Sequence, residues 1–221
     1  MKLIVNSLLV AFALGLCGCG TIVYERARFD GNRVSNPTLG RGVYYQIPDT
    51  YSVLNPWSPV PPKKENLEFE KYMRGFGAAN DQTRTEHAFR ETILFKAENR
   101  YLVIVQSAWN LPGTFRSMHP GKRSLLIRDM ASYPYRFFEV PQSDFDYTLE
   151  QIGGRTAVAY KPFRPGAIAA GAEWRGLGYT MLGDLTDTLH VILFARTEDL
   201  AVAEADLKFI IDHFSYGKPL P

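Results

Sequence analysis

Apolar positions near the C-terminus recur at the spacing of a helix. Five of them follow one another at intervals of three or four residues: Leu200, Ala203, Leu207, Ile210 and Phe214. This spacing places their side chains on one stripe of an α-helix. Thr197 offers a capping hydroxyl, and the carboxylates of Glu198 and Asp199 suit the positive end of a helix. The pattern predicts a C-terminal helix, capped by Thr197, whose apolar stripe packs on another layer.

Two long apolar runs in the middle of the chain predict a β-hairpin. Residues 87–96 and 100–109 are rich in β-branched and aromatic residues, and only residues 97–99 connect them. Residues 101–105 are apolar at every position. Neighbouring side chains of a strand point to opposite faces. Both faces of this strand are therefore apolar, and each should be covered by a helix or a second layer.

Five further segments are predicted strands: residues 135–141, 146–152, 155–163, 174–182 and 188–195. Two of these strands are joined by Gly153 and Gly154, which suit a tight hairpin turn. The last two flank the turn-rich residues 183–187 and predict another hairpin. The second half of the chain is thus expected to be mostly antiparallel sheet.

Shorter helical patterns occur at residues 65–76 and 123–132. Residues 55–66 carry four prolines, which favour a loop over a helix or a central strand. Together these elements predict an α+β fold: a mostly antiparallel sheet with a C-terminal amphipathic helix and one or two other helices packed on it. We expect one globular domain over residues 42–216, followed by a tail of residues 217–221.

The N-terminus has the order of a secretory signal. A positive start is followed by residues 3–16, which are apolar apart from Asn6 and Ser7. About 14 residues are too few for a bilayer core, which needs roughly 20. Because small residues follow at once, residues 1–18 are predicted to be a signal peptide that is removed.

The segment Leu16-Cys17-Gly18-Cys19 resembles the lipobox of bacterial lipoproteins. This resemblance implies cleavage before Cys19, a diacylglyceryl thioether on its thiol and an acyl chain, such as palmitate, on its freed amine. Two chains would give a stable anchor without a membrane span. It further implies a cell-envelope lipoprotein attached to a membrane through Cys19. The Gly at position 20, where an Asp would favour the inner membrane, favours the outer membrane, facing the periplasm.

The expected mature chain has a globular composition and little net charge. The sequence is 46% hydrophobic and 13% aromatic, as in folded domains rather than disordered ones. Removal of residues 1–18 leaves 203 of the 221 residues, discards Cys17 and, with Lys2, lowers the formal charge from +2 to +1. No thiol is left for a disulfide or a cysteine-ligated metal, and no basic excess indicates nucleic acid. We expect no cofactor and no metal site.

Residues 19–41 are predicted to be the lipidated N-terminus and a tether, punctuated by Gly31, Asn32 and Pro37. Four arginines are spread along it: Arg26, Arg28, Arg33 and Arg41. They could meet anionic head groups of the membrane. Alternatively, they are simply solvated, with Glu25 and Asp30 offsetting part of the charge.

The order of elements from residue 42 to residue 216 resembles the PsbP-like superfamily. The resemblance is carried by an early strand with a proline, YYQIPDTYSVL, a late hairpin, IGGRTAVAY, and a last helix ending IIDHFSY. Members of this group include extrinsic accessory and binding proteins, mostly without catalytic residues. The resemblance implies the fold and a non-catalytic role, and it assigns no site residue.

Candidate chemistry is sparse. His119, in a turn beside Lys122 and Arg123, is the best catalytic candidate, whereas His190 is expected to be a satisfied histidine at a strand edge. The motifs HExxH and GxSxG and the Walker loop are absent from the sequence. No catalytic, cofactor-binding or metal residue is therefore assigned.

Two functions of different class follow from these observations. The first is a membrane-anchored accessory or binding lipoprotein that contacts an envelope protein through aromatic side chains, with Trp57, Tyr133 and Tyr135 as the possible interaction surface. Core packing is the alternative role of these aromatic residues. The second function is a periplasmic hydrolase of unfamiliar type with a site around His119.

Overall fold

A computed structural model describes residues 25–39, 41–54, 64–80, 84–85, 88–109, 118–166, 173–183 and 187–220. Cys19 and Trp57 lie outside the described residues, so the predicted lipidation site and part of the predicted interaction surface have no structural account. Within the described ranges, no helix combines the length and the apolar character that crossing a membrane requires.

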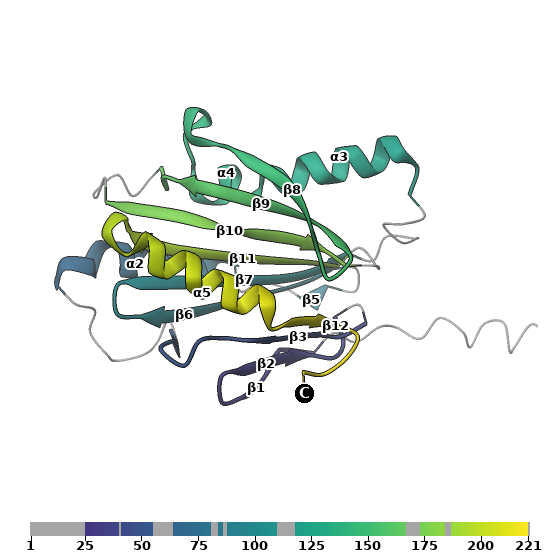
Figure 1. The fold of residues 1–221 in the computed structure, drawn as a ribbon, viewed down its shortest axis with the longest axis horizontal. Helices are drawn as coiled ribbons and strands as arrows, with labels where there is room; N and C mark the ends of the chain where they lie inside the picture. Colours follow the sequence, from purple (N-terminus) through teal and green to yellow (C-terminus); the bar gives the residue numbers. More distant parts are fainter. Residues whose placement is uncertain are drawn as a thin grey trace, which may run out of the picture.

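A large antiparallel sheet forms the centre of the molecule (Figure 1). Its strands run in the order β4-β6-β7-β11-β10-β9-β8, and β5 pairs with β6 beside that path. The predicted hairpins β6–β7, β8–β9 and β10–β11 are all present. Their bounds are β4 Ser52–Val53, β5 Arg84–Thr85, β6 Ala88–Ala97, β7 Arg100–Trp109, β8 Tyr147–Ile152, β9 Arg155–Phe163, β10 Trp174–Leu182 and β11 Asp187–Arg196.

A second antiparallel sheet has the order β1-β2-β3-β12. It joins the start of the chain to its end: β1 Arg28–Asp30, β2 Arg33–Asn36, β3 Val43–Gln46 and β12 Phe214–Tyr216. The segment expected to be a tether is therefore part of the fold from residue 28 onward. The physical reason is that β2 pairs with β3 along its whole length, while Val34 and Leu39 are buried.

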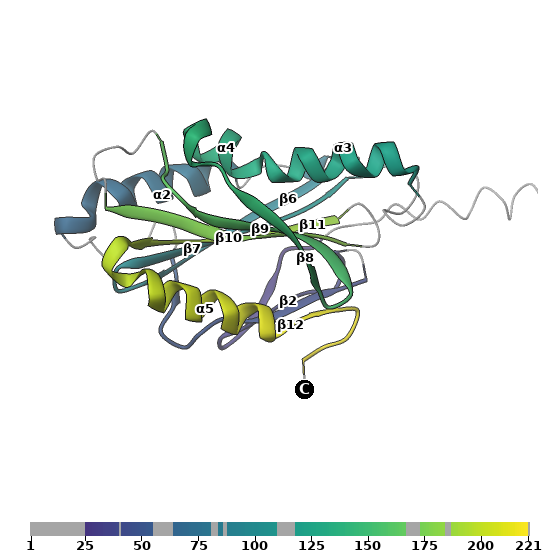
Figure 2. The ribbon, with the colours of Figure 1, turned by 45° about the horizontal axis from the view of Figure 1, so that its top comes forward.

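Helices and the small sheet cover the two faces of the large sheet, as the apolar strands predicted (Figure 2). Three helices lie on one face: α2 Leu67–Asn80, α3 Pro120–Ala131 and α4 Tyr133–Phe138. The other face is covered by α5 (Leu200–Asp212) and the small sheet. Each face has its own cluster of buried apolar side chains. The α+β class predicted from the sequence is confirmed.

The predicted strand over residues 135–141 is wrong, because most of this segment belongs to helix α4. Pro134 occupies the first turn of the helix, where a missing N–H is tolerated. Glu139, with a φ of 50°, ends the helix in the left-handed conformation. The helical turn places Tyr133 and Phe138 in the core, where Phe138 packs edge-on against Phe194 of β11. Tertiary packing thus overrides the strand preference of the aromatic residues.

The C-terminal helix is present, but Thr197 does not cap it. A short 3-10 turn, Thr197–Asp199, precedes α5. The Thr197 hydroxyl instead donates to the carbonyl oxygen of Glu173 at 2.9 Å. The apolar stripe packs as predicted within the helix, since Ala203, Leu207 and Ile210 are buried against the sheet. Phe214 was predicted to belong to it but does not, because α5 ends at Asp212 and Phe214 begins strand β12, where it pairs with Tyr45 of β3.

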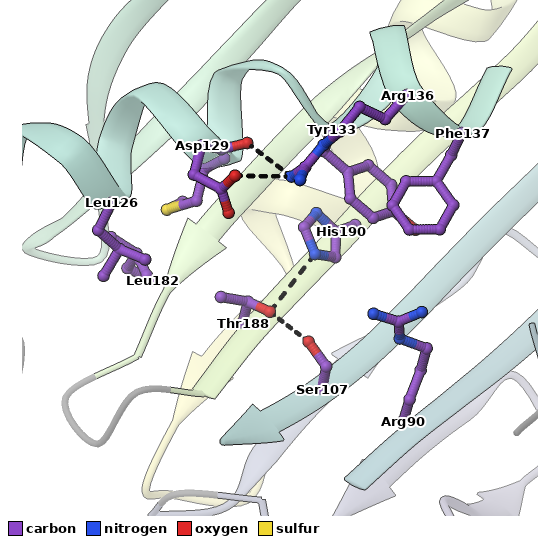
Figure 3. Close-up of a pocket in the computed structure, with 11 residues that line it drawn as sticks. Arg90, Ser107, Leu126, Asp129, Tyr133, Arg136, Phe137, Leu182, Thr188 and His190 are labelled. Atoms are coloured by element: carbon purple, nitrogen blue, oxygen red, sulfur yellow. Dashed lines mark hydrogen bonds and ion pairs between the residues drawn. The ribbon is translucent and has the colours of Figure 1, made fainter. Parts of the chain in front are cut away.

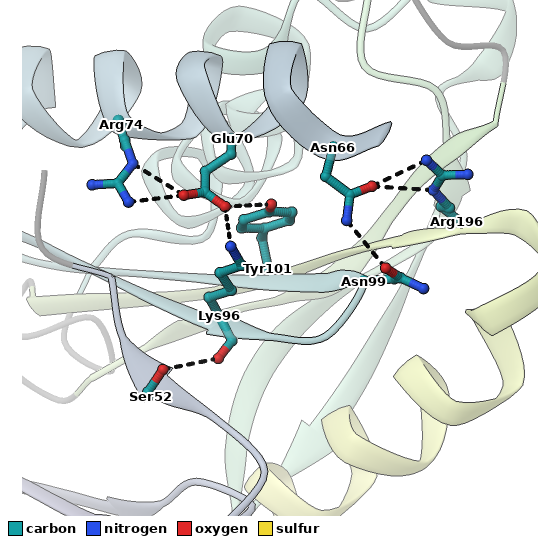
Figure 4. Close-up of polar contacts among 8 residues, drawn as sticks. All are labelled: Ser52, Asn66, Glu70, Arg74, Lys96, Asn99, Tyr101 and Arg196. Carbon is teal, nitrogen blue, oxygen red and sulfur yellow. Dashed lines mark hydrogen bonds and ion pairs between the residues drawn. The ribbon is translucent and has the colours of Figure 1, made fainter. Parts of the chain in front are cut away.

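A buried carboxylate fastens α2 to the large sheet (Figure 4). Glu70 is fully buried and accepts hydrogen bonds from Arg74 (2.8 Å), Tyr101 (2.9 Å) and Lys96. Burial alone would raise its pKa, but the hydrogen bonds from Lys96, Arg74 and Tyr101 outweigh burial and hold the pKa of Glu70 below its ordinary value. This network fixes α2 on the face of the large sheet that also carries α3 and α4.

Candidate functional site

Strand register places a row of four side chains across neighbouring strands. Arg90 on β6 pairs with Ser107 on β7, Ser107 pairs with Thr188 on β11, and Thr188 pairs with Leu182 on β10. His190 follows two residues along β11 and therefore points to the same face. These five residues come from four strands and form the floor of a pocket.

Helices α3 and α4 roof this floor and enclose a cavity of about 300 Å³ (Figure 3). The roof residues are Leu126, Asp129 and Met130 from α3 and Tyr133, Arg136 and Phe137 from α4. The volume lies at the lower end of the range for small-molecule sites. Most of the surface that faces the cavity is apolar, although six of the eleven lining residues, not counting Tyr133, carry polar or charged groups. A mainly apolar surface with some polar groups is the usual composition of a ligand pocket.

Hydrogen bonds fix the tautomer of His190. The Tyr160 hydroxyl donates to the carbonyl oxygen of Met130 at 2.6 Å. A hydroxyl carries one proton, so the Tyr160 oxygen accepts from Thr180 at 2.7 Å, and Thr180 in turn accepts from Nδ1 of His190 at 2.7 Å. Nδ1 therefore carries the proton, and Nε2 of His190 is left with a lone pair.

That lone pair is directed toward the polar side of the floor. Nε2 of His190 lies 3.4 Å from the hydroxyl of Thr188, which shares a hydrogen bond of 2.5 Å with Ser107. Figure 3 shows this chain running from the imidazole to β7. The hydroxyls of Thr188 and Ser107 carry one proton each. One of these protons forms the hydrogen bond between the two residues, and the other is available to Nε2 of His190 or to a bound ligand.

His190 is a neutral hydrogen-bonding group at physiological pH. Burial is the largest cause, and the positive charges of Arg90 and Arg136 add to it; together they lower the pKa of His190 to about 3. A general base works best when its pKa lies near the operating pH. His190 is therefore suited to accept a hydrogen bond from a ligand and unsuited to take up a proton.

The two pocket arginines are differently engaged. Arg136 forms an ion pair with Asp129 at 2.9 Å, and both side chains are more than half exposed, so this pair stands at the mouth of the pocket. Arg90 is half-buried, and its Cζ lies 5.5 Å from the centroid of the Phe137 ring. No carboxylate among the described residues pairs with Arg90. In Figure 3 its guanidinium points toward the interior below His190.

The arrangement supports binding rather than catalysis. Among the described residues, Ser107 has no adjacent base of suitable pKa, and the group hydrogen-bonded to Nδ1 of His190 is the Thr180 hydroxyl rather than a carboxylate. Within the described residues, no group of three or more His, Cys, Asp or Glu side chains could hold a metal ion. What remains is a small apolar pocket with one available guanidinium and a neutral polar chain.

The aromatic residues that were predicted to form an interaction surface differ in their position relative to this pocket. Tyr133 is only 5% exposed, which corrects its assignment to an exposed interaction surface: its ring is stacked on His190 and forms a pocket wall. Tyr135 lies in α4, but its side chain is outside what the structure describes. The proposed contact of Trp57 and Tyr135 with a partner stays a prediction.

His119 does not belong to the pocket. It is exposed at the N-cap of α3, where its Nδ1 accepts a hydrogen bond from the backbone N–H of Gly121 at 3.2 Å. Among the described residues, no carboxylate or hydroxyl forms a hydrogen bond with the His119 ring. The side chain thus acts as a helix cap, and the geometry gives no support to a hydrolytic site around it.

His190 was predicted to be a satisfied histidine at a strand edge, but it lies on the central strand β11 and not at an edge. One signal could have revealed it: Thr188 and His190 are polar at alternate positions beside the apolar run of residues 191–195, and a buried polar pair of this kind marks a special face. Arg90 and Ser107 carry no such signal, because only strand register brings them beside Thr188.

Comparison with known proteins finds similarity in structure but none in sequence. No protein-family model matches the chain, and no curated protein is similar to it in sequence. Among solved structures, it is similar to the solution structure of cyanobacterial PsbP (CyanoP) from Synechocystis sp. PCC 6803, with a TM-score of 0.44 and 10% sequence identity over 90% of this chain and 95% of that chain.

Proposed function

We propose that this protein is a membrane-anchored envelope lipoprotein that acts as a non-catalytic accessory or binding protein, with the pocket under α3 and α4 as its ligand site. The observation that carries the binding role is the pocket itself: an apolar cavity in which Arg90 has no carboxylate partner among the described residues and His190 is held neutral. Such groups orient a ligand without transforming it.

The anchor is supported by the N-terminal sequence. Leu16, Cys17 and Gly18 precede Cys19 in the order of a lipobox, after a short apolar run. A lipidated Cys19 would hold the pocket near a membrane surface, where the domain could present or receive a ligand for an envelope partner. The Gly at position 20 favours the outer membrane.

Membrane fractionation of the full-length protein in a Gram-negative host tests the anchor. The unchanged protein should sediment with membranes and resist extraction by high salt, whereas Cys19→Ala should be soluble or retain its signal peptide. Cys17→Ala is the matched control, because a small residue at that position preserves the lipobox and should leave membrane attachment intact. An intact mass equal to residues 19–221 without added lipid would refute the anchor.

A separate measurement tests the non-catalytic role. A ligand that binds the purified protein should be recovered chemically unchanged after prolonged incubation, as judged by chromatography and mass spectrometry. Formation of a product that depends on the protein would overturn this part of the proposal. Crosslinking in cells, followed by mass spectrometry, would identify the envelope partner.

A further inference from the structure

We infer that the pocket under α3 and α4 binds a small monocarboxylate with an apolar body. The carboxylate is taken by Arg90 beside Ser107, and the apolar body lies between Leu126, Met130 and Leu182. This inference rests on the proposed binding function and adds the chemical class of the ligand.

The net charge of the pocket lining favours a ligand with a single negative charge. Two guanidinium groups, Arg90 and Arg136, face one carboxylate, Asp129, and the buried His190 is neutral. The pocket therefore carries a net charge of +1. Because Asp129 is already paired with Arg136, the uncompensated charge belongs to Arg90.

The donors suit a planar anion. A guanidinium presents parallel N–H groups that match the two oxygens of a carboxylate. Ser107 lies opposite Arg90 on the neighbouring strand, so that their Cβ atoms are about 5 Å apart. Its hydroxyl can donate to the same anion once Thr188 donates to Ser107. A phosphate dianion would leave one negative charge uncompensated in a partly buried site, which is unfavourable.

The remaining walls select an apolar body of modest size. The side chains of Leu126, Met130, Leu182 and Phe137 line the cavity and carry no hydrogen-bond donor, and the Tyr133 ring adds an aromatic wall. A volume of about 300 Å³ admits a short aliphatic or single-ring body and excludes a two-chain lipid. A cationic ligand is disfavoured by the same charge on Arg90 that attracts a carboxylate.

Calorimetric titration with a series that shares one apolar body tests this inference. The probes are 4-phenylbutyrate, 4-phenylbutyramide, 4-phenylbutylamine and 3-phenylpropyl phosphate, with octanoate as an aliphatic carboxylate. At least one of the two carboxylates should bind with one-to-one stoichiometry. The amide should bind about ten- to a hundredfold more weakly than 4-phenylbutyrate, because it lacks the charge-assisted hydrogen bonds. The amine should not bind. Equal or tighter binding of the amide or the phosphate, or no binding of either carboxylate, would overturn the inference.

Two pairs of variants assign the binding to the pocket. Arg90→Gln should weaken carboxylate binding about tenfold or more, whereas Arg164→Gln, at an exposed arginine near Asp144, should not change it. Leu126→Trp fills the cavity and should abolish binding, whereas Leu125→Trp, at the neighbouring position that is 56% exposed, should bind normally. Unchanged binding by both Arg90→Gln and Leu126→Trp would place the ligand elsewhere and refute the site.

The two proposals fail in different ways. If 4-phenylbutyrate binds through Arg90 but is converted to a product, the ligand class stands and the non-catalytic role falls. If it is recovered unchanged but Arg90→Gln binds it as well as the natural protein, the binding role stands and the present inference falls. Circular dichroism of each variant confirms that a loss of binding is not a loss of fold.

Discussion

The ring of Tyr133 on α4 is stacked on the imidazole of His190 on β11, with centroids 3.7 Å apart and planes 11° from parallel. This contact joins the roof of the pocket to its floor. One face of the imidazole is covered by an aromatic ring, while its two nitrogens are held by Thr180 and Thr188. The stacked pair therefore sets both the depth of the cavity and the orientation of its central polar group.

Removal of the Tyr133 ring should loosen α4 from the sheet. Tyr133→Ala is expected to lower the free energy of unfolding by about 3 kcal/mol, in the range for large aromatic deletions from a core. Tyr133→Phe keeps the stacking and should cost less than about 1 kcal/mol. Urea unfolding measures both, with Tyr147→Ala on the exposed edge strand β8 as a control that should have a smaller effect. A Tyr133→Ala protein as stable as the natural one would show that α4 is held by other contacts.

Stability should fall in mild acid because His190 is buried in its neutral form. Its folded pKa of about 3 lies below the unfolded value of about 6.5. The unfolded chain therefore binds more protons between these values, and the contribution of His190 to stability is complete above pH 6.5 and is lost as the pH falls toward 3. Between pH 7.5 and pH 5 the expected loss is about 2 kcal/mol.

Urea unfolding at these two pH values measures this loss. His190→Asn removes the titrating group, so its stability should change less between pH 7.5 and pH 5 than that of the natural protein, whatever its absolute value. His119→Asn, at the exposed cap of α3, should retain the full dependence of the natural protein. A slope that is the same in His190→Asn and in the natural protein would mean that His190 does not carry the effect.

The hairpins were predictable because their signals are local. Gly153 and Gly154 suit the positive φ angles of a tight turn, and strand-forming residues lie on both sides of it. The hairpin of β1 and β2 was missed because β1 is exposed along its whole length and its sequence resembles a linker. The place of this hairpin in the fold depends on the pairing of β2 with β3, which the local sequence does not encode.

The candidate site was less predictable than the fold for a related reason. Arg90 and Thr188 are 98 positions apart in the sequence, and only the register of β6, β7 and β11 places them in one row, with Ser107 between them. Helix α4 closes the pocket, yet its aromatic residues have strand propensities, and packing against Phe194 and His190 decides its conformation. Only the alternation of Thr188 and His190 along β11 was visible in the sequence.

Loss of the charge on Glu70 should destabilise the protein strongly. Glu70→Gln would leave Lys96 and Arg74, which are both mostly buried, without their carboxylate, and breaking one partner of a buried ion pair typically costs about 3–5 kcal/mol. Glu68→Gln, at an exposed position of the same helix, is the control and should change stability by less than about 0.5 kcal/mol. Denaturant unfolding at pH 7 compares them, and an equal effect of the two variants would contradict a special role of Glu70.

The lowered pKa of Glu70 gives the same network a pH dependence at the acid end. Because the folded pKa lies below the unfolded value, the stabilisation is complete above the ordinary pKa of a glutamate, about 4.3, and is lost as the pH falls through the lowered value. The difference in stability between the natural protein and Glu70→Gln should therefore begin to shrink below about pH 4.3 and should vanish only below the lowered pKa of Glu70. A constant difference between them down to pH 2.5 would argue against this assignment.

Two glycines should respond to alanine in opposite directions. A Cβ on Gly178 in β10 would lie 2.1 Å from the carbonyl oxygen of Val191 on the neighbouring strand, so the backbone must shift, and Gly178→Ala should destabilise by roughly 2 kcal/mol or more. Gly75, inside helix α2, has open space at this position, and Gly75→Ala should stabilise by about 0.5–1 kcal/mol through helix propensity. Thermal and urea unfolding of both variants check the sign. A stabilised Gly178→Ala protein would show that β10 and β11 are farther apart than this structure places them.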